Sequence, residues 1–219
     1  MISSKRVRAV AIALSAAFLV SVASVQGQQA AVTDGAVYTA SGELVRPANY
    51  REWIFLSSGL AMTYGPLRET IGAQAPFNNV FVNPSSYRAF MKSGRWPEQT
   101  IFVLEVRRAE VNASINNGGR TQGEIIGLEA EVKDSARFAA TGGWAFFPLG
   151  SGADAAASVA PIADRAEVPE INNCYTCHRN NTAVENNFVQ FYPELFAVAR
   201  KMGTVKATFD PSHKVASTP

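Results

Sequence analysis

The pentapeptide Cys174-Tyr175-Thr176-Cys177-His178 constrains this chain more than any other segment. Two thiols three positions apart, followed directly by an imidazole, form the C-x-x-C-H attachment pattern of a c-type haem. Cys174 and Cys177 would form thioethers with one haem, and His178 would bind its iron as an axial ligand. The pattern therefore predicts one covalently attached haem c, and what occupies the other face of the iron is the open question.

Other uses of the two cysteines fit the chain less well. Cys174 and Cys177 are its only cysteines, so a disulfide would have to join these two. A thioredoxin-type C-x-x-C lies near the start of a βαβ unit, whereas this motif lies late in the chain. A structural zinc site takes four ligands, and His213, in a polar tail, is the only other histidine.

The N-terminus has the composition of a secretory signal peptide. Basic residues from Lys5 to Arg8 precede an apolar run, Ala9 to Val20, and small and polar residues follow it. The run is short for a transmembrane helix, although an uncleaved membrane anchor is the alternative. We expect residues 1–27 to be a signal peptide, cleaved after Gly27 or Ala30, and the mature chain to lie in the bacterial periplasm, where c-type haem is attached.

The composition is that of one soluble domain with an aromatic core. The formal net charge is +2, and no basic stripe indicates a nucleic-acid partner. Thirteen Phe, six Tyr and three Trp suit the apolar lining of a haem, and they suit a plain β-rich core as well. We expect a lead-in over residues 28–48, one haem domain over 49–205 and a flexible tail over 206–219.

Local patterns predict a mainly β, α+β fold with an antiparallel sheet. The clearest signal is the alternation over 124–133, where Ile126, Leu128, Ala130 and Val132 share one face and Gly127, Glu129, Glu131 and Lys133 share a face expected to be wet. Further strands are expected at 50–57, 80–82, 100–106 and 144–147. Helices are expected at 84–92, 134–138 and 193–202 and at the haem motif near the C-terminus, and loops at 112–123 and 150–170.

This order of elements excludes the commonest haem c folds. Small electron-transfer cytochromes c are helical and carry the motif near the N-terminus. Four-helix cytochromes c′ carry it late, but the chain before it is helical. The alternating strand at 124–133 suits neither arrangement.

Several separated segments instead resemble the cytochrome P-460 family, which includes the β-sheet cytochromes c′. The resemblance runs from about Pro47 to Gly203. The segments that carry it are Asn49-Tyr50-Arg51-Glu52-Trp53, Phe81-Val82-Asn83-Pro84 with Tyr87, Gly127–Ala130 with Val132–Ser135, Trp144-Ala145-Phe146, the haem motif and Phe188–Pro193. The resemblance implies an antiparallel β domain with one haem c, His178 as proximal ligand and an open or weakly occupied distal site.

One branch of that family oxidises hydroxylamine and has a lysine crosslinked to the haem, whereas the other binds nitric oxide or similar ligands in an apolar pocket. The family strand that carries the lysine reads Gly-Thr-x-x-x-Lys-Glu. Here Gln99-Thr100 begins the corresponding segment, and Leu104-Glu105 ends it. Leucine cannot form the crosslink, and Lys92 is out of register, so Leu104 favours a ligand-binding protein.

Candidates for the rest of the site are weaker. Met62, Met91 and His213 are possible sixth ligands; Met202 shares the apolar face of the last helix, which favours core packing. We expect the sixth position to be open or to hold water. Six phenylalanines are candidates for an apolar distal lining: Phe55, Phe77, Phe81, Phe102, Phe146 and Phe147. Three arginines either pair with haem propionates or are solvated: Arg51, Arg107 and Arg137. Glu185 matches an acidic position of the family.

These observations leave three functions open. The first is an exported mono-haem cytochrome that binds a small ligand such as nitric oxide at an apolar distal site. The second is a redox enzyme on hydroxylamine or a related nitrogen compound, and the third is a periplasmic electron carrier. Expected partners are the small ligand, a periplasmic redox protein and a second copy of the chain in a homodimer.

Overall fold

The computed structural model describes residues 34–62, 75–111, 114–115, 117–151, 155–162 and 173–213. The expected signal peptide and the first part of the lead-in lie outside these residues. Among the described helices, none has the length and apolar composition needed to cross a membrane.

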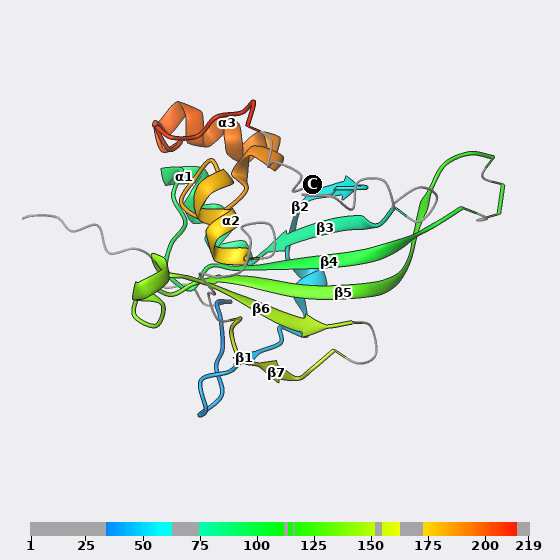
Figure 1. Cartoon of the computed structure of the whole chain (residues 1–219), viewed down its shortest axis with the longest axis horizontal. Helices are drawn as coiled ribbons and strands as arrows, with labels where there is room; N and C mark the ends of the chain where they lie inside the picture. Colours follow the sequence, from blue (N-terminus) through cyan, green and yellow to red (C-terminus); the bar gives the residue numbers. More distant parts are fainter. Residues whose placement is uncertain are drawn as a thin grey trace, which may run out of the picture.

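A five-stranded antiparallel sheet forms the centre of the molecule (Figure 1). Each strand pairs with the next one along the chain, in the order β2-β3-β4-β5-β6, so the sheet is a simple meander. The mainly antiparallel fold predicted from the sequence is thereby confirmed. The strands are β2 (Ile54–Leu60), β3 (Phe77–Val82), β4 (Ile101–Glu110), β5 (Thr121–Lys133) and β6 (Trp144–Gly150).

Different elements cover the two faces of this sheet. Three helices lie on one side: α1 (Pro84–Ser93), α2 (Cys174–Asn181) and α3 (Pro193–Met202). A small sheet lies on the other side, where β1 (Leu44–Val45) pairs with β7 (Ser158–Val159) (Figure 1). We call these the helix face and the back face of the five-stranded sheet. Each has its own buried apolar cluster.

Strand β5 shows how the alternating pattern maps onto these faces. Leu128, Ala130 and Val132 are 3%, 3% and 0% exposed and belong to the back-face cluster, as the alternation predicts. The expectation that the opposite face is wet holds for Glu129, which is exposed, but it is wrong where the helices cover that face. Glu131, which belongs to it, is only 8% exposed. Alternation identifies two faces, but it does not tell what covers them.

Helices α1 and α3 form where the sequence predicts them. Pro84 and Pro193 stand at the first helical positions, and Gly94 and Gly203 end the helices in the left-handed conformation with φ of 67° and 66°. Phe90 of α1, at 0% exposure, and residues of α3 belong to one buried cluster. The packing role expected for Met202 is wrong, since this residue is 45% exposed.

The helix predicted at 134–138 is absent from the structure. The backbone N–H of Asp134 donates to Gly143 O at 2.7 Å, and that of Gly143 donates to Phe138 O at 2.8 Å. These bonds close the connection between β5 and β6 as a series of turns, and a single 3-10 turn, η3 (Ala139–Thr141), follows. The segment is too short for a helix because both its ends are fixed by neighbouring strands.

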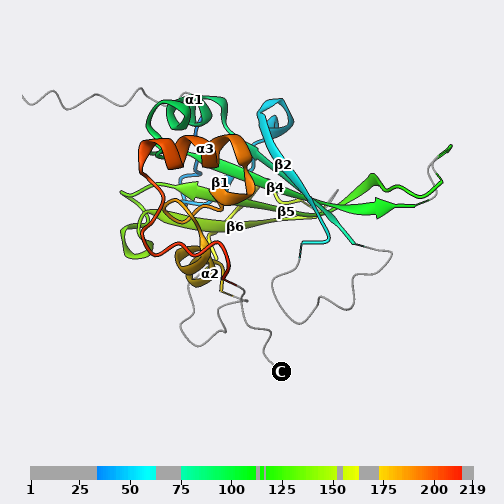
Figure 2. The same cartoon turned by 90° about the horizontal axis from the view of Figure 1, so that it is seen from above.

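The expected loops are shorter than the sequence indicates. Strand β5 begins at Thr121, inside the loop expected over 112–123. The β4–β5 hairpin therefore extends well past its neighbours (Figure 2). Within the connection expected over 150–170, Ser158 and Val159 form β7 and pair with β1.

Candidate functional site

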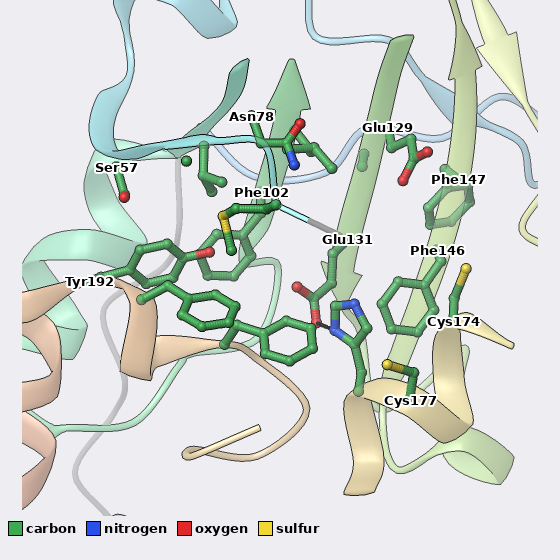
Figure 3. Close-up of a pocket in the computed structure, with 18 of the residues that line it drawn as sticks. Ser57, Asn78, Phe102, Glu129, Glu131, Phe146, Phe147, Cys174, Cys177 and Tyr192 are labelled. Atoms are coloured by element: carbon green, nitrogen blue, oxygen red, sulfur yellow. Dashed lines mark ion pairs between the residues drawn. The ribbon is translucent and has the colours of Figure 1, made fainter. Parts of the chain in front are cut away.

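A cavity of about 430 Å³ lies on the helix face of the sheet, which is within the usual size of a cofactor pocket. Its wall includes residues from all five strands, from α2 and from the segment around η6 (Val189–Phe191). Cys174 and Cys177 lie at one side of this cavity, and Ser57 and Asn78 lie across from them (Figure 3).

Helix α2 brings the three predicted haem ligands together. Cys174, Cys177 and His178 are spaced by three and four residues, so one helical turn places them on a common face, and all three line the cavity. Asn173 caps the helix by accepting the backbone N–H of Thr176 at 3.2 Å. Cys174 and Cys177 are not joined in a disulfide, and burial raises the pKa of Cys174.

The ring of His178 is oriented by its surroundings. Its Nδ1 lies 2.8 Å from the backbone oxygen of Asn186, so this nitrogen donates and Nε2 is left to bind a metal. The rings of Phe146 and Phe188 pack against the imidazole, with centroids 4.4 Å and 4.5 Å from that of the imidazole ring. No sequence motif indicates the backbone oxygen of Asn186 as the partner of His178.

A second group also lies beside Nδ1 of His178. Glu131 Oε1 is 3.3 Å from this nitrogen and has no hydrogen-bond partner, although it is fully buried. Its other oxygen, Oε2, accepts the side-chain N–H of Asn187 at 2.9 Å. A buried carboxylate oxygen without a partner is costly unless positive charge lies close by. An imidazole bound to iron supplies such charge, so this site fits a haem held by His178.

The cavity wall combines apolar and acidic groups. Leu104 lies in register between Val80 on β3 and Glu129 on β5, and all three line the cavity. Burial raises the pKa of Glu129, while His178 acts in the opposite direction. Apolar side chains form most of the wall, and Glu129, Glu131 and Asn78 add polar groups that the sequence analysis did not expect there.

The phenylalanine candidates separate into two groups. Phe102, Phe146 and Phe147 line the cavity. Phe81 instead packs on Tyr50 at the back face, with 5.5 Å between ring centroids, and Phe55 is 53% exposed. Phe77 does not line the cavity either. Three aromatic residues from the resemblance segment Phe188–Pro193, for which no lining role was expected, are also part of the wall: Phe188, Phe191 and Tyr192.

The charged candidates for haem contacts have other partners. Arg51 and Arg107 bind Glu105, which lies on the back face of β4, each at 2.5 Å. Arg137 lies 4.0 Å from the ring centre of Tyr38 and 3.6 Å from Asp134. None of the three lines the cavity.

Glu185 likewise does not line the cavity. Its carboxylate forms an ion pair of 2.6 Å with Lys133. Lys133 also donates to the backbone oxygen of Trp96 at 2.7 Å. This pair therefore ties the loop after α2 to the end of β5, close to Asn186 and its bond to His178.

Of the possible sixth ligands in the described residues, Met62 alone lines the cavity. Its sulfur occupies the space that a side chain at Gly59 would fill. Met91 and Met202 are 37% and 45% exposed, and His213 lies in a turn after α3, with its backbone N–H bonded to Asp210 O at 3.2 Å.

Comparison with known protein families gives one match. The family model described as Cytochrome P460 matches residues 47–189, well over half of the chain. The match begins where the resemblance begins, includes β2 to β6 and the C-x-x-C-H motif, and ends before α3. No curated protein matches the chain. The matched segment, which contains the strands and α2 that form the cavity, shows that the chain belongs to the cytochrome P460 family.

Proposed function

We propose that this chain is an exported mono-haem c-type cytochrome that binds a small ligand such as nitric oxide on the face of the iron opposite His178. The observation that carries the proposal is the cavity in which Cys174, Cys177 and an oriented His178 meet. Membership of the cytochrome P460 family supports a haem as the group that this cavity holds.

The residues of α2 have distinct roles in this proposal. Cys174 and Cys177 attach the haem covalently, and the bond from Nδ1 of His178 to Asn186 keeps Nε2 directed at the metal. The haem supplies an iron that binds small ligands and changes oxidation state. Phe146 and Phe188 restrict rotation of the imidazole by packing against it.

The wall of the sheet supports selection of a small ligand. Val80, Phe102 and Leu104 present apolar side chains, which exclude water and leave space for a diatomic molecule. Met62 is the residue that would compete for the iron. Thioethers are weak ligands for ferric iron. We therefore expect added nitric oxide to displace Met62 from the iron.

Absorption spectroscopy of the protein, expressed with haem-maturation machinery, tests this proposal. We expect a covalent haem whose spectrum changes on addition of nitric oxide, in the wild type and in Met62→Leu alike. A low-spin, six-coordinate spectrum that ignores nitric oxide in both oxidation states would contradict ligand binding. If Met62→Leu then restored the response, Met62 would be the blocking ligand and electron transfer the better proposal.

A redox enzyme on hydroxylamine or a related nitrogen compound is the second candidate, and Glu129 is the observation that favours it. A carboxyl group whose pKa is raised by burial keeps its proton to a higher pH than an ordinary glutamate, so it can donate that proton to a bound substrate. Leu104 argues against this candidate, because it has no amine for a crosslink. Steady turnover of hydroxylamine with an electron acceptor, lost in Glu129→Gln, would establish the enzyme.

We further propose a periplasmic location, a periplasmic redox partner and a homodimer. The basic and apolar N-terminal segment supports export. Fractionation of cells that express the full chain tests the location, and size-exclusion chromatography with light scattering tests the dimer.

A further inference from the structure

Glu131 is the most deeply buried carboxylate in the cavity wall and the one beside the predicted iron ligand. It is 8% exposed, and Asn187, at 1% exposure, holds its Oε2 at 2.9 Å. This bond aims Oε1 at the imidazole of His178, 3.3 Å from Nδ1. Oε1 has no hydrogen-bond partner, because the ring N–H is directed at Asn186 O.

The placement has an electrostatic consequence for the iron. When Nε2 binds a metal, the imidazole becomes more positive, and an adjacent carboxylate stabilises that charge. The stabilisation is larger for ferric than for ferrous iron because the ferric state carries one more positive charge. The negative charge 3.3 Å from Nδ1 also polarises the ring, so Nε2 becomes a stronger electron donor to the metal.

We propose that Glu131 is a positioning residue that strengthens the bond between His178 and the iron and favours the ferric state. This inference rests on the proposed role of His178 as axial ligand. It differs from the role of Glu129, which lies two residues away on the same face of β5 and is exposed to the cavity. Glu129 therefore offers a matched control: a second glutamate, on the same strand, in the same cavity.

Two measurements on the haem-loaded protein test the proposal: the iron–histidine stretching frequency by resonance Raman and the ferric/ferrous equilibrium by redox titration. Mutation of an outer-shell partner of a metal ligand typically costs about 10–100-fold in metal affinity or activity. We expect Glu131→Gln to lower the stretching frequency and to shift the equilibrium about tenfold toward ferrous iron, which is about 59 mV for one electron. Glu129→Gln should leave the stretching frequency unchanged.

The outcomes separate this inference from the proposed function. An unchanged frequency and potential in Glu131→Gln, or an equal shift of both in Glu129→Gln, would overturn the role of Glu131. If Glu131→Gln fails to fold, Glu131→Asp is the deciding variant, because its shorter side chain moves the charge away from His178. It should shift the stretching frequency and the redox equilibrium partway in the same direction. No shift in Glu131→Asp would overturn the role of Glu131. An iron–histidine band that persists in His178→Ala would instead contradict His178 as ligand, and with it the proposed function.

Discussion

Substitution of Glu105 by glutamine should destabilise the protein without changing its haem. Glu105 is 2% exposed and lies on the back face of β4, next in sequence to Leu104 on the helix face. It accepts hydrogen bonds from Arg51 and Arg107, each at 2.5 Å, from Asn79 at 3.2 Å, and from the hydroxyl of Tyr50. Glutamine keeps the shape of the side chain and removes its charge.

The cost follows from the burial of the partners. Removing one member of a buried ion pair typically costs about 3–5 kcal/mol because the other charge stays buried. Arg107 is 17% exposed and cannot rehydrate fully, whereas Arg51, at 52%, can turn into solvent. We therefore expect the low end of the range, about 3 kcal/mol. Urea unfolding measures it: with a slope of about 2 kcal/mol per M, the midpoint should fall by about 1.5 M.

The pH dependence of this cost is a second consequence. Burial alone would raise the pKa of Glu105, but hydrogen bonds from Arg107, Tyr50 and Asn79 hold it below its ordinary value of 4.5. A carboxyl group with a lowered pKa contributes its stability above its ordinary value, and that contribution is lost as the pH falls through the lowered pKa. The difference between wild type and Glu105→Gln should therefore shrink below pH 4.5.

Glu124→Gln is the matched control, because the pair of Glu124 with Arg108 is a similar contact of 2.8 Å whose side chains are 66% and 43% exposed. It should cost less than about 1 kcal/mol. If Glu105→Gln cost no more than this control, the argument from burial would be refuted. A shifted haem spectrum in Glu105→Gln would refute the assignment of Glu105 to the back face.

Three further predictions concern the haem, the core and the cavity. Cys174→Ala together with Cys177→Ala should abolish covalent haem, as measured by mass spectrometry; retained covalent haem would contradict the attachment. Phe90→Ala should cost about 3–5 kcal/mol in urea unfolding, because Phe90 is fully buried with its ring centroid 4.1 Å from that of Trp96. Because burial raises the pKa of Glu129, the wild type should lose stability relative to Glu129→Gln as the pH rises above 4.5 and through the raised pKa. A pH-independent difference between these two proteins would be inconsistent with the shift.

The elements that the sequence predicts well are those with local causes. Proline at the start and glycine at the end define α1, and the left-handed φ of 67° at Gly94 is a conformation that glycine adopts readily. The helix expected at 134–138 fails because bonds from Asp134 to Gly143 and from Gly143 to Phe138 hold that segment in turns. Strand β7 could not be predicted because two residues pair only where a distant segment, β1, meets them.

The same distinction between local and distant causes applies to the site. The meeting of Cys174, Cys177 and His178 could be predicted from the sequence, because their spacing needs only one turn of helix to bring the side chains together. The sequence also determined that β5 has two unlike faces, since side chains alternate along any strand. The packing of α2 over the face with Glu129 and Glu131 is visible only in the folded chain, which places both carboxylates in the cavity wall and buries Glu131. The physical reason is that alternation depends on the backbone of one strand, whereas burial depends on which distant segment packs against it.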